Sequence, residues 1–262
     1  MTDPRSRPPL AYKNDEFLKG PDSRPLRILS EYLEPLSHFR RQRIRDTIVF
    51  FGSARIQEDG PLGQYYREAR ELAGLVTTWA KTFRERTYRF VVCSGGGPGI
   101  MEAANRGAMD VKGKTIGLNI GLPFEQFPND YITTELSFEF HYFFMRKFWF
   151  AYLAKALVVF PGGFGTMDEL FEILTLVQTK KLSKKITIIL YGSSFWKEIV
   201  NFDALIKYGT ISKADLDLFQ FADTPDAAMD ILKRALTEQA TISGAEAEPE
   251  VPAISHTARP ED

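Results

Sequence analysis

The sequence of 262 residues predicts an α/β fold in which a mostly parallel sheet carries helices on both faces. Short apolar runs typical of buried strands alternate with stretches of helical periodicity. Several of these runs end in glycine loops directly before an expected helix. The sequence shows no internal repeat of fixed period. A hydrophobic content of 44% supplies a sizeable core for one large domain or two small ones. The pattern is that of a doubly wound, Rossmann-like fold.

The two ends of the chain differ from this pattern. Residues 1–25 are rich in Pro, Arg and Asp without periodicity, which predicts a disordered arm. Residues 26–46 have helical spacing and form an expected N-terminal extension, with Pro35 as a break or kink. The small, acidic and Pro-containing residues 238–262 predict a disordered acidic tail. The α/β domain then covers residues 47–237.

In chain order, "TIVFFGSA" (47–54) is an apolar strand that ends in Gly and Ser. "RFVVCSGGGPG" (89–99) is a strand that runs straight into a glycine loop, and "KTIGLNI" (114–120) is a third strand. "ITTELSF" (132–138) is a shorter fourth candidate. The remaining expected strands, with the loops they feed, are 156–163 and 185–192. Helices are expected at 61–86, 100–111, the aromatic segment around 141–150, 166–180, 194–207 and 225–237.

Composition excludes several classes of protein. The formal net charge of -1 and pI of about 6.4 give no global field toward nucleic acid or an anionic membrane. Cys93 is the only cysteine, which excludes an intramolecular disulfide and fits a cytoplasmic protein. The N-terminal residues lack the apolar core of a secretory signal. Charged residues interrupt the apolar stretch 138–160 too often for a membrane span.

Three strands end in small-residue loops: Gly52-Ser53, residues 94–99 and residues 161–166. Ligands of doubly wound sheets bind beyond the carboxyl ends of the strands, so these loops are expected to gather on one edge. Glycine allows close approach to a ligand, and a helix N-terminus behind the loop offers free N–H groups to an anion. Both longer loops have this form, which predicts phosphate binding. A tight strand-to-helix turn is the simpler alternative for either loop alone.

The loop sequences narrow the choice of phosphate compound that the site is expected to bind. Neither loop contains G-x-x-x-x-G-K-[ST], and neither fits G-x-G-x-x-G, because Glu102 stands at the third glycine position. The strand 114–120 also lacks a terminal acid for an adenosine ribose, which argues against a dinucleotide cofactor. The absence of G-x-S-x-G argues against a Ser-His-Asp hydrolase. The expected ligand is a monophosphate.

Two charged groups accompany the loops. "HYFFMRKFWF" (141–150) sets Arg146 and Lys147 among aromatics on an expected buried helix. A buried guanidinium needs a carboxylate, a ligand or both. "PGGFGTMDELFEI" places Thr166 at the expected helix start, Asp168 and Glu169 in the first turn, and Glu172 one turn beyond. The alternatives are a structural salt bridge for Arg146, and helix-dipole complementation by the acids.

"SGGGPGIMEAANRGA" (94–108), "MRK" (145–147) and "PGGFGTMDE" (161–169), in this order, resemble the LOG family, nucleoside 5′-monophosphate phosphoribohydrolases once labelled possible lysine decarboxylases. The resemblance implies hydrolysis of AMP or cytokinin ribotides to free base and ribose 5-phosphate, on a Rossmann-like LOG domain at 47–237. It implies no metal and no cofactor, and the sequence offers no case for a pyridoxal-phosphate lysine. The implied catalytic pair is Arg146 and Glu169. The implied nucleotide-binding residues are Gly52, Ser53, Gly96, Gly97, Gly99, Met101, Lys147, Gly162, Gly163, Gly165, Thr166 and Glu172.

The alternative is a non-catalytic carrier of a nucleotide or of molybdenum cofactor, since such relatives share the glycine loops and need not retain the Arg–Glu pair. A nucleotide-sensing subunit that acts on a partner through the N-terminal arm is a third hypothesis. The aromatic segment around 141–150 predicts a homodimer or higher homo-oligomer, because its apolar sides exceed what one neighbouring helix covers.

Overall fold

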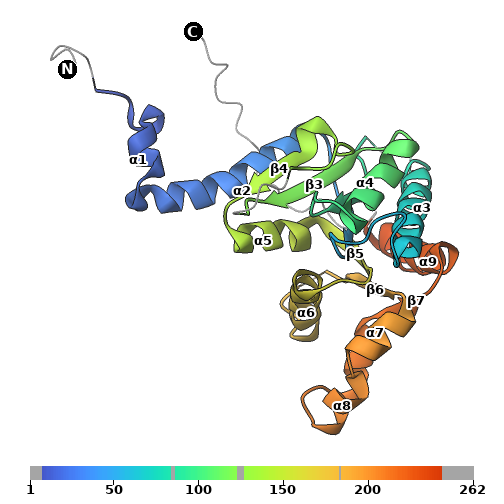
Figure 1. Ribbon diagram of the computed structural model, residues 1–262. Helices are drawn as coiled ribbons and strands as arrows, with labels where there is room; N and C mark the ends of the chain where they lie inside the picture. The colour runs from blue at the N-terminus through green and yellow to red at the C-terminus, as the bar shows by residue number, and fades with distance from the viewer. Residues whose placement is uncertain (1–7, 84–85, 123–126, 183, 244–262) are drawn as a thin grey trace.

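A seven-stranded sheet, parallel throughout, forms the centre of the computed structural model (Figure 1). The structure describes residues 8–83, 86–122, 127–182 and 184–243. The strand order is β4-β3-β2-β1-β5-β6-β7. The strands are β1 Thr47–Phe51, β2 Val91–Ser94, β3 Thr115–Ile120, β4 Ser137–Phe140, β5 Ala154–Val159, β6 Thr187–Tyr191 and β7 Gln220–Ala222. The expected doubly wound fold is confirmed.

Helices cover both faces of the sheet because alternate strand residues point to opposite sides. Ile48 and Phe50 of β1 lie in one apolar cluster with α3, α4 and α9, whereas Val49 and Phe51 lie in a second with α2, α5, α6 and α7. The first set of helices is α3 Gly63–Ala80, α4 Ile100–Asp110 and α9 Pro225–Ser243. The second set is α2 Arg24–Arg41, α5 Phe143–Leu153, α6 Phe164–Gln178 and α7 Ser193–Ile199.

The direction of winding reverses between β1 and β5. From β1 the chain moves outward to β2, β3 and β4, with α3 and α4 on one face. It returns to β5 on the other side of β1 and continues to β6 and β7, with α6 and α7 on the opposite face. A crevice opens beyond the carboxyl ends of strands at such a switch point. The loops after β1 and β5 therefore flank the expected ligand position.

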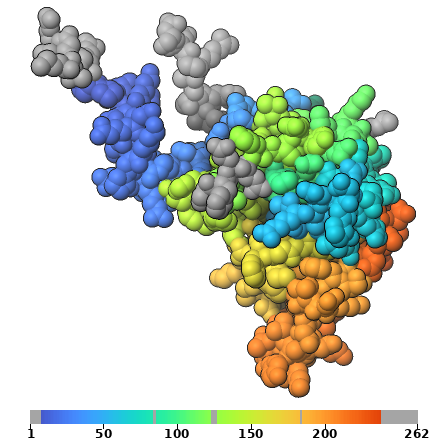
Figure 2. Space-filling view, in the orientation of Figure 1, coloured from blue at the N-terminus to red at the C-terminus, as the bar shows by residue number. Residues whose placement is uncertain are grey.

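The N-terminal segment differs from the expected disordered arm. Residues 11–13 and 21–23 form single 3₁₀ turns, and α1 spans Asp15–Lys19. Local hydrogen bonds explain this order: Asn14 Oδ1 caps α1 by accepting from the Phe17 N–H, and Arg27 donates to the carbonyls of Leu18 and Gly20. As Figures 1 and 2 show, α1 and the start of α2 extend away from the sheet. Residues 1–7 lie outside the described chain.

The expected break at Pro35 is also absent, since α2 runs through it. Proline removes the hydrogen bond to the carbonyl four residues earlier, which is that of Glu31. The Trp149 indole N–H of α5 donates to this carbonyl instead, at 2.9 Å, so the acceptor that Pro35 leaves free has a partner. A second helix thus supplies the partner that the sequence of α2 lacks.

Other boundaries shift. The candidate strand 132–138 becomes a 3₁₀ turn at Thr134–Leu136 followed by β4. The segment 194–207 divides into α7 and α8 Phe202–Lys207. Helix α9 continues to Ser243, and the rest of the predicted acidic tail, residues 244–262, lies outside the described chain. Within the described ranges, no helix has the length and apolar character needed to cross a membrane.

Candidate active site at the carboxyl edge of the sheet

The three small-residue loops meet at Ser53. Its N–H donates to the Pro161 carbonyl at 3.0 Å, and its carbonyl accepts from the Ile100 N–H at 3.1 Å. Ser53, in the loop after β1, is thereby joined both to the loop after β5 and to the start of α4, which follows the first glycine loop. Close packing reinforces the junction, because a Cβ at Gly52 would overlap Ile100. The expected convergence on one edge is confirmed.

The second glycine loop presents an uncapped helix end. Helix α6 begins at Phe164 after Gly163, and no side chain caps it, so the first N–H groups remain available to an anion. Packing requires glycine at 162, where a Cβ would overlap the Thr166 side chain. A Cβ at Gly163 or Gly165 would meet no atom within 4 Å. Open space beside these two glycines suits the close approach of a ligand.

The start of α6 at Phe164 changes the position of the acids. The sequence placed Asp168 and Glu169 in the first turn, but they lie in the second. Helix-dipole complementation falls off within the first turn, so this alternative explains Glu169 poorly. Glu169 is 5% exposed and Thr166 is also buried. A carboxylate at such a depth needs another reason for its presence.

The second ionic group comes from α5. The Glu31 carboxylate of α2 accepts from the His141 and Tyr142 N–H groups at 2.8 and 3.2 Å, which fixes the start of α5. One turn later, Arg146 Nη2 lies 3.6 Å from Glu169 Oε1. The Arg146 guanidinium also packs over the Phe150 ring, at 5.4 Å from its centroid. Its Nε–H is buried and has no hydrogen-bond partner among the described residues. The guanidinium therefore has donor capacity left for a ligand.

Lys147 takes a different position. Its Nζ lies 2.6 Å from Glu172, 2.8 Å from Asp168 and 3.8 Å from Glu169. Two cations of α5 thus face three carboxylates of α6. Glu172 pairs with a neighbouring cation. Contact of Lys147 and Glu172 with a nucleotide stays a prediction.

Burial sets the protonation of the pair. It raises the pKa of the Glu169 carboxyl to about 7, although Arg146 and then Lys147 act in the opposite direction. Burial also lowers the pKa of Arg146, against the attraction of Glu169. A carboxyl that titrates near neutral pH suits proton transfer.

The first glycine loop is held by the backbone and side-chain amides of Asn129. The backbone N–H of Asn129 donates to the Gly96 carbonyl at 2.8 Å, and the Asn129 side chain donates to the carbonyls of Gly96 and Gly97 at 3.0 Å. Gly96 and Gly99 have φ of +74° and +70°, conformations that favour glycine. A Cβ at Gly95 would press on the Met101 sulfur and come within 3.9 Å of Arg146 Nη2. This loop therefore lies beside the Arg146–Glu169 pair.

A cavity of about 320 Å³ lies at the switch point. It is lined by Ser53, Arg55, Ile56, Gln57, Gly60, Pro61, Leu62, Pro161, Gly162 and Phe195. Arg55 is the single charged residue among these described lining residues. Sequence reasoning missed Arg55 and Phe195: the first follows the small residues after β1, and the second lies on a helix far along the chain.

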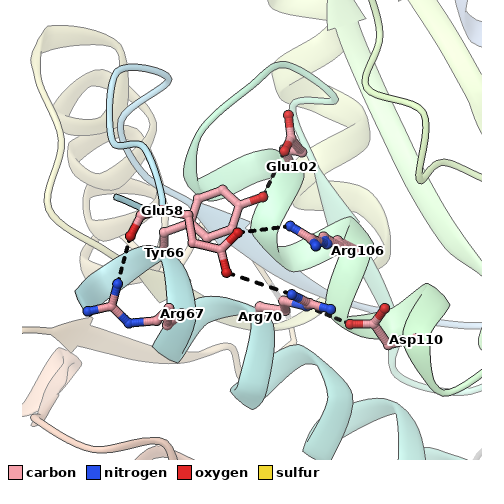
Figure 3. A network of polar contacts seen from close by, with 7 residues as sticks. All are labelled: Glu58, Tyr66, Arg67, Arg70, Glu102, Arg106 and Asp110. Carbon is pink, nitrogen blue, oxygen red and sulfur yellow. Dashed lines mark hydrogen bonds and ion pairs between the residues drawn. The ribbon is translucent and has the colours of Figure 1, made fainter. Parts of the chain in front are cut away.

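A polar network fixes the loop that forms this cavity (Figure 3). The Glu58 carboxylate pairs with Arg106 at 3.0 Å. The backbone carbonyl of Glu58 accepts a hydrogen bond from Arg67 at 2.6 Å. The Tyr66 hydroxyl donates to Glu102 in the first turn of α4, at 2.7 Å. Burial and this hydrogen bond raise the pKa of Tyr66 to about 12, so the phenol keeps its proton. The network ties the loop after β1 to α3 and α4.

The fold and this edge define a Rossmann-like α/β protein with uncapped helix ends and a largely buried Arg–Glu pair. A family model described as "Possible lysine decarboxylase" matches residues 101–232, half of the chain. The chain belongs to this family, the LOG family that the motifs indicated.

Among solved structures, the chain is similar to the crystal structure of TM1055, a structural genomics target, with 19% identity, a TM-score of 0.52, and coverage of 72% of this chain and 99% of that one. It is also similar to a Moco carrier protein from Chlamydomonas reinhardtii, with 21% identity, a TM-score of 0.49, and coverage of 74% and 99%. At these identities the likeness shows the fold alone. No curated protein sequence matches the chain.

Proposed function

We propose that this protein hydrolyses the N-glycosidic bond of nucleoside 5′-monophosphates, such as AMP or cytokinin ribotides, to free base and ribose 5-phosphate. The observation that carries the proposal is the largely buried Arg146–Glu169 pair, which lies about one helical turn beyond an uncapped helix end with two open glycines. Phosphate binding at the helix end sets the 5′ side of the sugar against Gly163, Gly165 and Thr166. The sugar ring then extends toward Glu169.

Bond cleavage builds positive charge on the C1′–O4′ unit of the ribose, as in glycoside hydrolysis. The C1′–N bond breaks, its electron pair leaves with the base, and the base takes a proton from solvent. Glu169 stabilises the cation and accepts a proton from the water that attacks C1′. It later returns this proton to solvent. Arg146 keeps Glu169 ionised and oriented, and its unpaired Nε–H donates to the ribose or phosphate.

Release of the base tests the proposal. Purified protein is incubated with AMP, GMP, CMP, UMP and isopentenyladenosine monophosphate, and free base is measured by chromatography. We expect base from at least one of them, with an equal amount of ribose 5-phosphate. Tight nucleotide binding without base release from any of the five would favour the carrier or sensor function instead.

We further propose that the chain assembles as a homodimer or higher homo-oligomer. Large aromatic side chains of α5 and α6 lie exposed in the single chain: Phe143, Phe144, Phe148, Phe164 and Phe171. Phe164, at the mouth of the glycine loop, is 93% exposed. Apolar surface of this kind marks a contact with another protein. Light scattering is expected to give at least twice the monomer mass at micromolar concentration, and the mass of one chain would contradict the proposal.

A further inference from the structure

A second cavity, of about 560 Å³, lies at the opposite edge of the sheet, where β2 and β3 begin. Its described lining residues are Arg43, Thr77, Ala80, Lys81, Phe83, Arg86, Thr87, Tyr88, Arg89, Phe90, Val91, Lys112, Gly113 and Lys114. Six of these fourteen are Arg or Lys and none is Asp or Glu. The whole chain has 33 basic and 34 acidic residues, so the cavity concentrates positive charge that the chain as a whole lacks.

The fold accounts for only part of this charge. Arg89 is buried in an ion pair with Asp46 at 3.0 Å. Lys81 donates to the carbonyls of Val111 and Lys112 just beyond the end of α4, a usual position for a cation. These contacts explain two of the six basic residues.

The other four cations are Arg43, Arg86, Lys112 and Lys114. None of them forms an ion pair with a carboxylate among the described residues. Lys114 donates to the side chain of Gln42 at 2.6 Å and lies 4.2 Å from the centroid of the Tyr88 ring. Burial lowers the pKa of Lys114; Glu135 opposes this effect and Arg43 adds to it. Like charges gathered around a cavity repel one another unless an anion lies between them.

A buried hydroxyl points to the same conclusion. Thr77 of α3 is 6% exposed, lines the cavity, and its Oγ1 has no hydrogen-bond partner among the described residues. A buried hydroxyl without a hydrogen-bond partner destabilises the fold. The methyl group of Thr77 packs against Gly113, where a Cβ would overlap it. The exposed ring of Tyr88 adds an apolar surface beside the cations.

We propose that this cavity binds a small, multiply charged phosphate compound, with Arg43, Lys112 and Lys114 as its cationic partners and Thr77 as a hydroxyl partner. The volume lies within the range of small-molecule sites. The six residues of β3 separate this cavity from the carboxyl edge by about 20 Å. The proposed site is therefore distinct from the nucleotide site and independent of the proposed hydrolase activity.

Calorimetric titration with inorganic tripolyphosphate tests the proposal, with a nucleoside triphosphate and AMP as further arms. Wild type is expected to bind tripolyphosphate, more weakly as salt rises. The double variant R43Q/K114Q is expected to lose at least about tenfold in affinity. Tighter binding of the nucleoside triphosphate than of tripolyphosphate would indicate that the cavity also contacts the nucleobase, for instance through the ring of Tyr88.

The control K207Q/K233Q removes the same charge from exposed positions elsewhere and is expected to bind like wild type. Thr77→Val keeps the shape of the side chain; we expect weaker binding with unchanged thermal stability, and unchanged affinity would overturn the role of this hydroxyl. Absence of binding in wild type, or equal binding by folded R43Q/K114Q, would overturn the site.

Discussion

Replacing Glu169 with Gln is expected to lower turnover of nucleoside monophosphates by about 10²–10⁴-fold while nucleotide binding stays largely intact. The amide keeps the size of the side chain but cannot accept the proton of the attacking water or stabilise the sugar cation. The proposed phosphate contacts come from the backbone at the start of α6, which the substitution does not touch. Single-turnover rates and nucleotide affinity, measured separately, distinguish the two effects.

The pH profile supplies a second readout of the same group. Since the pKa of Glu169 is raised to about 7 and the base must be ionised, kcat/KM is expected to fall about tenfold per unit as pH drops below 7. In E169Q this acid limb disappears. Asp168→Asn is the matched control, because Asp168 is an exposed carboxylate on the same helix that contacts Lys147. Turnover in E169Q within about tenfold of D168N would refute the role of Glu169.

The sequence predicted the features that depend on local pattern. Buried strands and glycine loops are each written in a few neighbouring residues, and the parallel topology then brings the loops after β1, β2 and β5 to one edge. The resemblance of two motifs to the LOG family implied that Arg146 acts together with Glu169, and the cost of burying a guanidinium required a carboxylate or a ligand beside Arg146. The roles of both residues remain predictions.

Features that depend on distant partners were not predictable in this way. The continuity of α2 through Pro35 depends on an indole N–H from α5 more than a hundred residues later. The ordered structure around residues 11–23 depends on the Leu18 carbonyl, which accepts hydrogen bonds from the side chains of Ser23 and Arg27. The basic cavity gathers residues from α3 and from the loops before β1, β2 and β3, which form no motif in the chain. Tertiary contacts outweigh local propensity at each of these places.

Replacing Arg146 with Ala is expected to lower turnover at pH 7 by at least about 10²-fold, through the protonation of Glu169 as well as through the lost contact. Arg146 is the cation that most strongly lowers the pKa of this buried carboxyl. Without it the pKa rises further above its ordinary value, so the carboxyl is mostly protonated at neutral pH and cannot act as a base. Lys147 remains at 3.8 Å but is already paired with Asp168 and Glu172.

This mechanism gives R146A a signature that a purely structural role lacks. Its acid limb is expected to move to higher pH, and part of the lost activity should return near pH 9, where Glu169 ionises again. E169Q should gain nothing at any pH. R146K keeps a positive charge without the planar fork of donors. We therefore expect R146K to bring the acid limb of the pH profile close to its wild-type position, while its maximal turnover stays below that of wild type. Thermal unfolding between pH 6 and 9 separates these effects from misfolding: an ionised, unpaired Glu169 makes R146A less stable as pH rises. An R146A profile with the wild-type limb would show that Arg146 does not hold Glu169 in its ionised form.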